Sequence, residues 1–114
     1  MTLTIWHNPR CTKSRQTLAL LEEKGLSPEV RPYLQDPPSA EELHEVLDVL
    51  GGDIGPMTRR KEAAFKEAGL TKDSSADEVI AAMVTHPILI ERPIVLNNGK
   101  AAIGRPPENV LSVL

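Results

Sequence analysis

The sequence has little cysteine, few aromatic residues and no long apolar run. Cys11 is the only cysteine, which excludes an internal disulfide, a dithiol cycle within the chain and a metal site built from cysteines. The aromatic residues Trp6, Tyr33 and Phe65 are too few for a platform on which single-stranded nucleic acid could stack. No stretch approaches the roughly 18 apolar residues of a membrane span. We therefore expect no metal, no nucleic-acid partner and no membrane partner.

The size and composition indicate one small domain. The chain has 114 residues, of which 40% are hydrophobic, enough for one modest core in a domain that spans residues 1–114. A domain of this size buries about two-thirds of its unfolded surface, so it needs no metal or disulfide to fold. The N-terminus has no basic region followed by a long apolar one, so no export signal is expected. Together with the free thiol, this favours a cytoplasmic location.

Positive charge gathers near the cysteine. The net charge of the whole chain is −3, which argues against general nucleic-acid binding. Residues 1–21 nevertheless contain three basic residues, Arg10, Lys13 and Arg15, and no acidic one. The rest of the chain has sixteen acidic against ten basic residues, a charge of −6. A basic cluster around the only cysteine of an acidic protein is the first indication of a functional site.

The first third of the sequence predicts a strand, a loop, a helix and a second strand. Residues 2–6 alternate in hydrophobicity and favour a strand, and residues 7–10 form a proline-containing loop. A helix over residues 11–24 follows and ends at a glycine. Residues 29–34 predict the second strand, and Pro32 places it at an edge of the sheet, because proline cannot donate to a strand ladder.

The middle of the chain predicts a block of helices. The helices expected over residues 39–50 and 75–86 each begin with an S-x-x-E capping box. A further helix is expected over residues 57–68, where it ends at a glycine. This block separates the strands at the two ends of the sequence.

The last part predicts a hairpin and a final helix. The strand-forming residues 93–96 and 101–103 flank a short turn that contains Asn-Gly, which is typical of a hairpin. Two prolines then favour the first turn of a last helix, lined by Val110, Leu111 and Leu114. The whole order is β-α-β, a helical block, and β-β-α, so we expect an α/β protein.

Cys11 is the strongest candidate for chemistry. It follows a strand and a loop, and it lies at the start of a predicted helix, where unpaired amides and the helix dipole favour a thiolate. The three nearby basic residues act in the same direction. A lone cysteine is commonly buried and inert, but this surrounding favours a nucleophile.

The residues near the cysteine exclude several cysteine chemistries. Thr17 stands where a phosphatase-type C-x5-R loop has its arginine, and Ser14 stands where a C-x-x-C dithiol has its second cysteine. His44 and His86 are explained as a solvated helix residue and a helix-end residue, so a Cys–His protease is not indicated. His7 lies on the same loop as the cysteine and is either its partner or a loop histidine bonded to the backbone.

Four arginines form a second group of candidates: Arg59, Arg60, Arg92 and Arg105. Arg92 and Arg105 bracket the predicted hairpin, so both could reach one site. An arginine at the end of a strand suits planar contacts to a tetrahedral oxyanion, although surface solubility is the alternative for any single one. The Arg92–Pro93 bond is a candidate cis peptide.

These residues and spacings resemble one known family. The segments H-N-P-x-C-x-x-S-R at residues 7–15 and H-P-x-L-I-x-R-P-I-V at residues 86–95, with I-G-R-P at residues 103–106, are similar to the glutaredoxin-coupled arsenate reductases. The match covers nearly the whole chain, in order. It implies a thioredoxin-like α/β fold with a helical insertion over about residues 38–88, which agrees with the expected order of elements.

The resemblance also implies a role for each residue of the site. Cys11 corresponds to the nucleophile, and His7 and Ser14 correspond to residues that assist the thiolate. The positions implied for substrate binding are Arg59, Arg92, Arg105, Asn8 and Arg15. Arg60 is the alternative to its neighbour in the alignment.

The resemblance further implies how the reaction is completed. Arsenate is attacked by the Cys11 thiolate, glutathione supplies the second thiol as a co-substrate, and glutaredoxin clears the mixed disulfide. No bound cofactor is expected. With one cysteine in the chain, the second thiol has to come from outside.

Two other functions stay open. A glutathione-dependent thiol-disulfide reductase would use the arginines to bind the carboxylates of glutathione. A redox regulator that binds RNA polymerase is the second alternative, and Ser14 argues against it because such regulators of this superfamily use a C-x-x-C switch.

Overall fold

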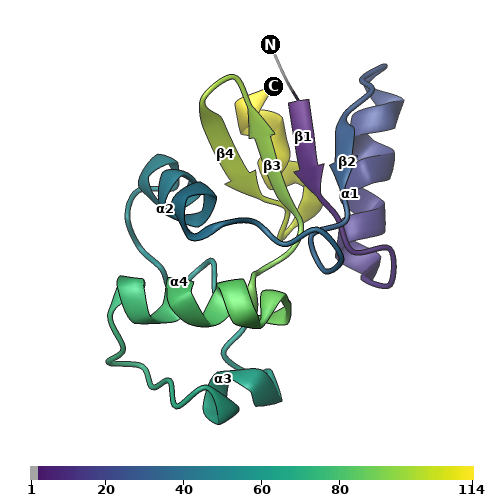
Figure 1. Ribbon diagram of the computed structural model, residues 1–114. Helices are drawn as coiled ribbons and strands as arrows, with labels where there is room; N and C mark the ends of the chain where they lie inside the picture. The colour runs from purple at the N-terminus through teal and green to yellow at the C-terminus, as the bar shows by residue number, and fades with distance from the viewer. Residues whose placement is uncertain (1–2) are drawn as a thin grey trace. The chain divides into compact units, whose positions relative to one another are not determined.

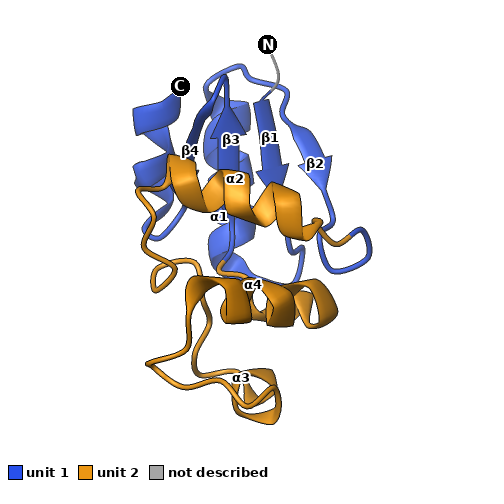
Figure 2. Cartoon of the chain, turned by 60° about the vertical axis from the view of Figure 1, so that its left-hand side comes forward, with its two compact units in different colours: residues 1–36, 92–114 blue, residues 37–91 orange. Residues whose placement is uncertain are grey.

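The computed structural model describes residues 3–114, which form two compact units (Figures 1 and 2). The first unit comprises the chain up to Asp36 together with Arg92–Leu114, and the second is Pro37–Glu91. In sequence, the second unit is therefore inserted between the two parts of the first. Among the described residues, none of the helices combines the length and the apolar character that a membrane crossing requires.

A four-stranded mixed sheet lies at the centre of the first unit (Figure 1). Its strands are β1 (Leu3–Trp6), β2 (Glu29–Arg31), β3 (Ile94–Asn97) and β4 (Lys100–Ile103), in the order β2-β1-β3-β4. β1 runs parallel to β2 and antiparallel to β3, and β3 pairs antiparallel with β4. The helix α1 (Thr12–Glu23) connects β1 to β2. This confirms the α/β class, and residue 2 of the first predicted strand lies outside the described residues.

The second strand occupies the predicted edge but is shorter than predicted. β2 ends at Arg31, because Pro32 has no amide hydrogen with which to continue the ladder. The Pro32 carbonyl instead accepts hydrogen bonds from the amides of Gln35 and Asp36, both at 2.9 Å, and closes a turn. Tyr33 lies within this turn and is completely buried.

The hairpin of β3 and β4 closes as the Asn-Gly signal predicts. Asn97 pairs with Lys100, and the two residues between them have positive φ angles, 53° at Asn98 and 80° at Gly99. Two consecutive left-handed residues give the turn a twist that matches the twist of the strands. The position of the turn therefore follows from the local sequence alone.

The core of the first unit is formed by residues of the sheet and of the helices that follow β1 and β4. Its buried cluster contains Ile5, Leu21, Val95, Ala102, Val110 and Val113. The last helix is a 3-10 helix, η2 (Pro107–Val113), and its inward face differs from the prediction. Val110 and Val113 are buried, whereas Leu111 and Leu114 are 39% and 44% exposed. Residues three apart share a face in a 3-10 helix, so the two valines point inward together and the two leucines outward.

The second unit contains two capped helices. α2 (Ala40–Val49) and α4 (Ala76–Thr85) both begin with the predicted capping box. In each box the serine hydroxyl oxygen accepts from the glutamate amide, and the glutamate carboxylate accepts from the serine amide. α2 contacts α4, and α4 contacts the 3-10 helix η1 (Pro87–Leu89). The buried residues of the two α-helices are Leu43, Val46, Leu47, Val79, Ile80 and Met83.

The helix predicted over residues 57–68 is wrong in its first half. Only α3 (Ala63–Glu67) is an α-helix in that stretch. The residues before it pair with the segment that follows η1, where the Arg59 amide donates to the Leu89 carbonyl at 2.8 Å. This pairing removes a backbone donor that a helix would use, and because its partner lies thirty residues further on, no local pattern predicts it.

Gly104 is packed too closely to carry a side chain. A Cβ atom there would lie 2.6 Å from Thr17 Oγ1 and 2.7 Å from Pro93 Cγ. We expect Gly104→Ala to lower the free energy of unfolding by about 1–3 kcal/mol, because buried Thr17 cannot move away without strain. Chemical denaturation measures the difference.

The matched control is Gly55→Ala, whose new Cβ would approach only the ends of two flexible side chains, Arg60 and Asp53, both at 3.2 Å. Its free energy of unfolding should change by about 0.5 kcal/mol or less. Equal stability of the two variants would contradict the close packing at Gly104.

Candidate active site

Three segments of the first unit leave the sheet at the same end of its strands. Trp6, the last residue of β1, pairs with Ile94, the first residue of β3, and Ile94 pairs with Ile103, the last residue of β4. The loop after β1, the residues before β3 and the residues after β4 therefore start side by side. These are the segments that contain Cys11, Arg92 and Arg105.

Cys11 is the residue directly before α1. Its backbone is extended (φ −94°, ψ 123°), and its amide donates to the Asn8 carbonyl at 3.0 Å. Its own carbonyl accepts the Arg15 amide at 3.0 Å, which is the first hydrogen bond of the helix. A side chain at this position lies against the free amides of the first turn. The sulfur is thus placed where a helix favours negative charge.

Two opposing effects act on the pKa of the Cys11 thiol. The residue is 7% exposed. Burial raises the pKa of the Cys11 thiol, but a hydrogen bond from the Ser14 backbone amide and the guanidinium groups of Arg92 and Arg105 lower it. Their combined effect prevails, so the pKa lies below the ordinary value of a cysteine. The surroundings thus shift the balance toward the thiolate relative to an ordinary cysteine.

The two arginines come from opposite ends of the hairpin. Arg92 is partly buried and Arg105 is exposed, and the Arg105 Nε–H donates to the Arg92 carbonyl at 3.2 Å. Both guanidinium groups lie near enough to the cysteine sulfur to lower the pKa of the thiol. The Arg92–Pro93 peptide, a candidate from the sequence, is cis, and the Arg105–Pro106 peptide is cis as well. Both arginines therefore act on the same sulfur, and their role in binding a substrate stays a prediction.

A buried hydrogen-bond network lies beneath the cysteine loop. His7 Nδ1 and Ser14 Oγ are 2.6 Å apart, and the Asn8 amide donates to the same oxygen at 3.0 Å. Burial lowers the pKa of His7, and the nearby Arg15 lowers it further, so the imidazole is neutral at pH 7. The resemblance assigns Ser14 to the thiolate. Its backbone amide reaches the sulfur, whereas its hydroxyl is engaged by His7 and Asn8.

Asn8 and Arg15 both brace the loop. The Asn8 Oδ1 atom accepts the Arg10 amide at 3.0 Å. The Arg15 Nη1 group donates to the Pro9 carbonyl at 2.8 Å. These bonds fix the backbone of the loop on both sides of Pro9, and so fix the position of the cysteine that follows it.

Arg59 belongs to the second unit and is held by two carboxylates. Its Nε–H donates to Glu62 Oε1, and its Nη1 group donates to Glu91 Oε1, both at 3.1 Å. The neighbouring Arg60 is exposed and turns a different way, with its Nη2 atom close to Gly55. The two adjacent arginines are therefore not equivalent. Within the described residues, no group of three or more His, Cys, Asp or Glu side chains could hold a metal ion.

The sequence that contains these residues matches a known family. The model of a family described as the ArsC family matches residues 6–113, which include every residue of the site. The chain belongs to the ArsC family.

Relatives resemble the chain over almost its full length. A protein of Escherichia coli K12 named Uncharacterized protein YfgD is 51% identical over 112 residues, or 96% of this chain and 94% of the relative. A protein of Neisseria meningitidis named Arsenate reductase is 48% identical over 114 residues, or 98% and 97% of the two chains. A solved structure titled Arsenate reductase from Vibrio cholerae has a TM-score of 0.94 at 51% identity, covering 100% of this chain and 98% of that one.

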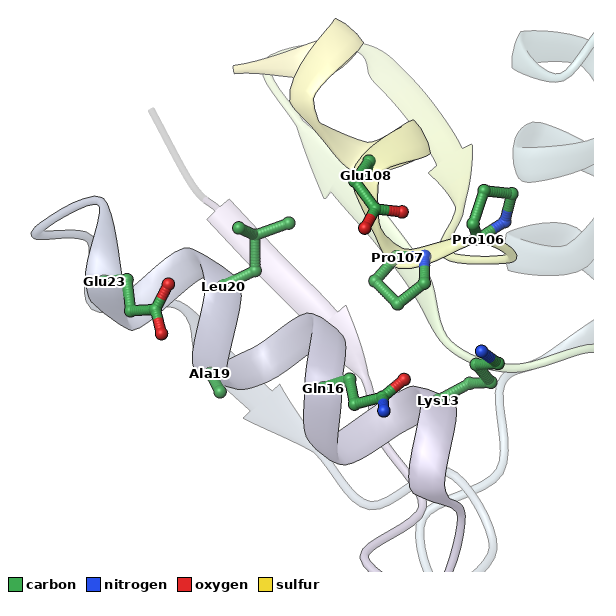
Figure 3. Close-up of a pocket in the computed structure, with 8 residues that line it drawn as sticks. All are labelled: Lys13, Gln16, Ala19, Leu20, Glu23, Pro106, Pro107 and Glu108. Carbon is green, nitrogen blue, oxygen red and sulfur yellow. The ribbon is translucent and has the colours of Figure 1, made fainter.

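A groove beside the site distinguishes one face of this ArsC protein. It has a volume of about 550 Å³ and lies between α1 and the start of η2 (Figure 3). The residues that line it are Lys13, Gln16, Ala19, Leu20, Glu23, Pro106, Pro107 and Glu108. Two of them, Lys13 and Pro106, are close in sequence to Cys11 and Arg105.

Tyr33 is the site residue that sequence reasoning missed. It is fully buried in the turn after β2, and its hydroxyl group lies beside the Arg92 guanidinium. Burial lowers the pKa of Arg92, but contacts with Cys11 and Tyr33 raise it above its ordinary value. The one available signal was a tyrosine next to a strand-ending proline in a chain with three aromatic residues.

Alkylation of Cys11 tests whether Arg92 sustains the thiolate. We expect the rate of reaction with iodoacetamide to rise with pH with an inflection below the ~8.5 of a free cysteine. In Arg92→Met the inflection should move upward, because burial remains and the strongest positive group is lost. The rate at pH 7 should fall several-fold.

The control is Arg10→Met, which removes an exposed charge next to the cysteine in sequence. Its pH profile should follow that of the unmodified protein. An inflection in the unmodified protein at or above the free-cysteine value would refute an activated thiol.

Proposed function

We propose that the protein is an oxidoreductase that reduces arsenate to arsenite through the Cys11 thiolate, with electrons from glutathione and glutaredoxin. The observation that carries this proposal is the buried sulfur at the start of α1 with the guanidinium groups of Arg92 and Arg105 on it. Relatives named arsenate reductase, at about half identity over the full length, support the choice of substrate.

The arginines suit a tetrahedral oxyanion. A guanidinium group offers two parallel N–H donors to two oxygens of one anion, which a lysine cannot do. Arg92 and Arg105 would bind arsenate next to the sulfur that attacks it. The family resemblance adds Arg59 as a third binding residue. Asn8 and Arg15 support the site by bracing the loop.

In the first step, the Cys11 thiolate attacks arsenic(V). A sulfur–arsenic bond forms, and one arsenate oxygen leaves as water after it gains protons. The thiolate is the competent form because the attacking electron pair must be free. The positive charge that lowers the thiol pKa also attracts the anionic substrate, so the same two arginines serve both purposes.

In the second step, the sulfur of glutathione attacks the Cys11 sulfur of the adduct. A disulfide forms, the sulfur–arsenic bond breaks, and its electron pair stays on arsenic, which leaves as arsenite in the +3 state. The two sulfurs thus supply the two electrons. Glutaredoxin then reduces the Cys11–glutathione disulfide by thiol exchange. Such a cycle requires a reducing compartment, as the cytoplasm is.

His7 and Ser14 act in this proposal by holding the loop. Their hydrogen bond and the bond from the Asn8 amide keep the Ser14 backbone amide directed at the sulfur. The neutral imidazole adds no charge of its own. Their contribution to the thiolate is therefore one of position.

Arsenite production tests the proposed activity. Purified protein with glutathione, glutaredoxin and arsenate should form arsenite, and Cys11→Ser should form none. Arg105→Lys should lower kcat/KM for arsenate about tenfold or more, because the charge stays but the paired donors are lost.

The matched control is Arg60→Lys, which should keep the kinetics of the unmodified protein, whereas Arg59→Lys should not. Full activity of Arg105→Lys would contradict the oxyanion site. Reduction of glutathione mixed disulfides without any arsenate turnover would favour the thiol-disulfide reductase instead.

The route of the electrons gives a separate test. Without glutaredoxin, the enzyme should stall with one glutathione on Cys11, because exchange at a buried sulfur is slow without a catalyst. Ser14 occupies the place of a resolving cysteine and cannot form a disulfide. Mass spectrometry of the stalled protein detects the adduct.

Cys11→Ser under the same conditions should carry no glutathione. Full turnover with thioredoxin alone and no glutathione would rule out this route.

A further inference from the structure

Arg59 and Glu91 are brought together by a short backbone ladder within the second unit. The Arg59 amide donates to the Leu89 carbonyl at 2.8 Å, and the Glu91 amide donates to the Met57 carbonyl at 2.6 Å. The residues between these bonds, Thr58 and Ile90, pair as an antiparallel bridge. The contact between the two side chains therefore has a fixed backbone beneath it.

Two carboxylates share one guanidinium group at this place. Arg59 makes ion pairs of 3.1 Å with both Glu62 and Glu91. All three side chains are shielded from solvent, with exposed fractions of 20%, 27% and 18% for Arg59, Glu62 and Glu91. Shielded charges are screened less by salt than surface charges. The cluster carries one positive and two negative charges.

An anion that approaches Arg59 meets both attraction and repulsion. A guanidinium group has five N–H donors, and the two ion pairs use its Nε–H and one Nη1–H, so three remain. The two carboxylates next to them repel any further negative charge. They can also accept a hydrogen bond, and a carboxylate accepting from a hydroxyl makes a short and strong one.

This combination separates oxyanions by their protons. Sulfate carries no hydroxyl group at neutral pH, so every oxygen that faces a carboxylate is repelled. Hydrogen arsenate and hydrogen phosphate keep at least one hydroxyl group, which can donate to a carboxylate while the other oxygens accept from the guanidinium. A site that leaves the wrong ligand with an unpaired charge gains selectivity against it.

We propose that Glu62 and Glu91 are specificity-determining residues that restrict the anion bound at Arg59 to one that carries a hydroxyl group. The inference rests on the proposed function, in which Arg59 binds the substrate oxyanion. It adds that the carboxylates around Arg59 exclude sulfate. Sulfate is similar to arsenate in size and shape, so those two properties alone would not exclude it.

Direct anion binding measures selectivity without turnover. Phosphate or sulfate is titrated into the protein at constant ionic strength, and isothermal titration calorimetry gives an affinity for each anion. In the unmodified protein, phosphate should bind at lower concentrations than sulfate. In Glu62→Gln and in Glu91→Gln, the preference for phosphate should fall about tenfold, mainly because sulfate binds more tightly.

The matched control is Glu67→Gln, which removes the same charge from an exposed position on α3. It should keep the preference of the unmodified protein. Thermal unfolding of each variant verifies that it is folded, and the two single variants test the inference independently of each other.

Three results would overturn the inference. If both anions gain affinity equally, the carboxylates only weaken binding, and if both lose affinity, the carboxylates only orient Arg59. An unchanged preference in both glutamine variants would also overturn it. Selective binding in a protein that forms no arsenite would count against the proposed reaction alone.

Discussion

Stabilisation of a negative charge on the buried Cys11 sulfur is the constraint on which the first unit depends. Burial by itself favours the neutral thiol, so the thiolate exists only where enough donors and positive groups surround it. One donor is local, the Ser14 amide in the first turn of α1. The other two, Arg92 and Arg105, lie more than eighty residues away in the sequence. The lowered pKa of the thiol therefore depends on tertiary structure, although the cysteine and its helix are local features.

The sheet supplies the distant groups. Because β3 lies antiparallel to both β1 and β4, the start of β3 lies beside the ends of β1 and β4. Residues just after β1, just before β3 and just after β4 therefore lie at the same end of the sheet. Gly104 allows the segment after β4 to pass close to Thr17 and Pro93, where a side chain would not fit. The hydrogen bond between His7 and Ser14 ties the loop before Cys11 to α1, and it pairs their buried polar atoms with each other.

The two arginine groups illustrate different uses of one residue type. Arg92 and Arg105 act on a sulfur whose negative charge they stabilise. Arg59 already has two carboxylate partners, which lower its net attraction for an anion.

The sequence by itself determined the features that depend on neighbouring residues. The capping boxes at Ser39 and Ser75, the Asn-Gly turn, the edge strand before Pro32 and the position of Cys11 before a helix all follow from contacts within a few residues. Tertiary structure decided the rest. It replaced half of a predicted helix with the ladder at Arg59, turned Val113 inward in place of Leu114, and set Tyr33 beside Arg92. Each of these depends on a partner brought near by folding, and sequence periodicity carries no record of such a partner.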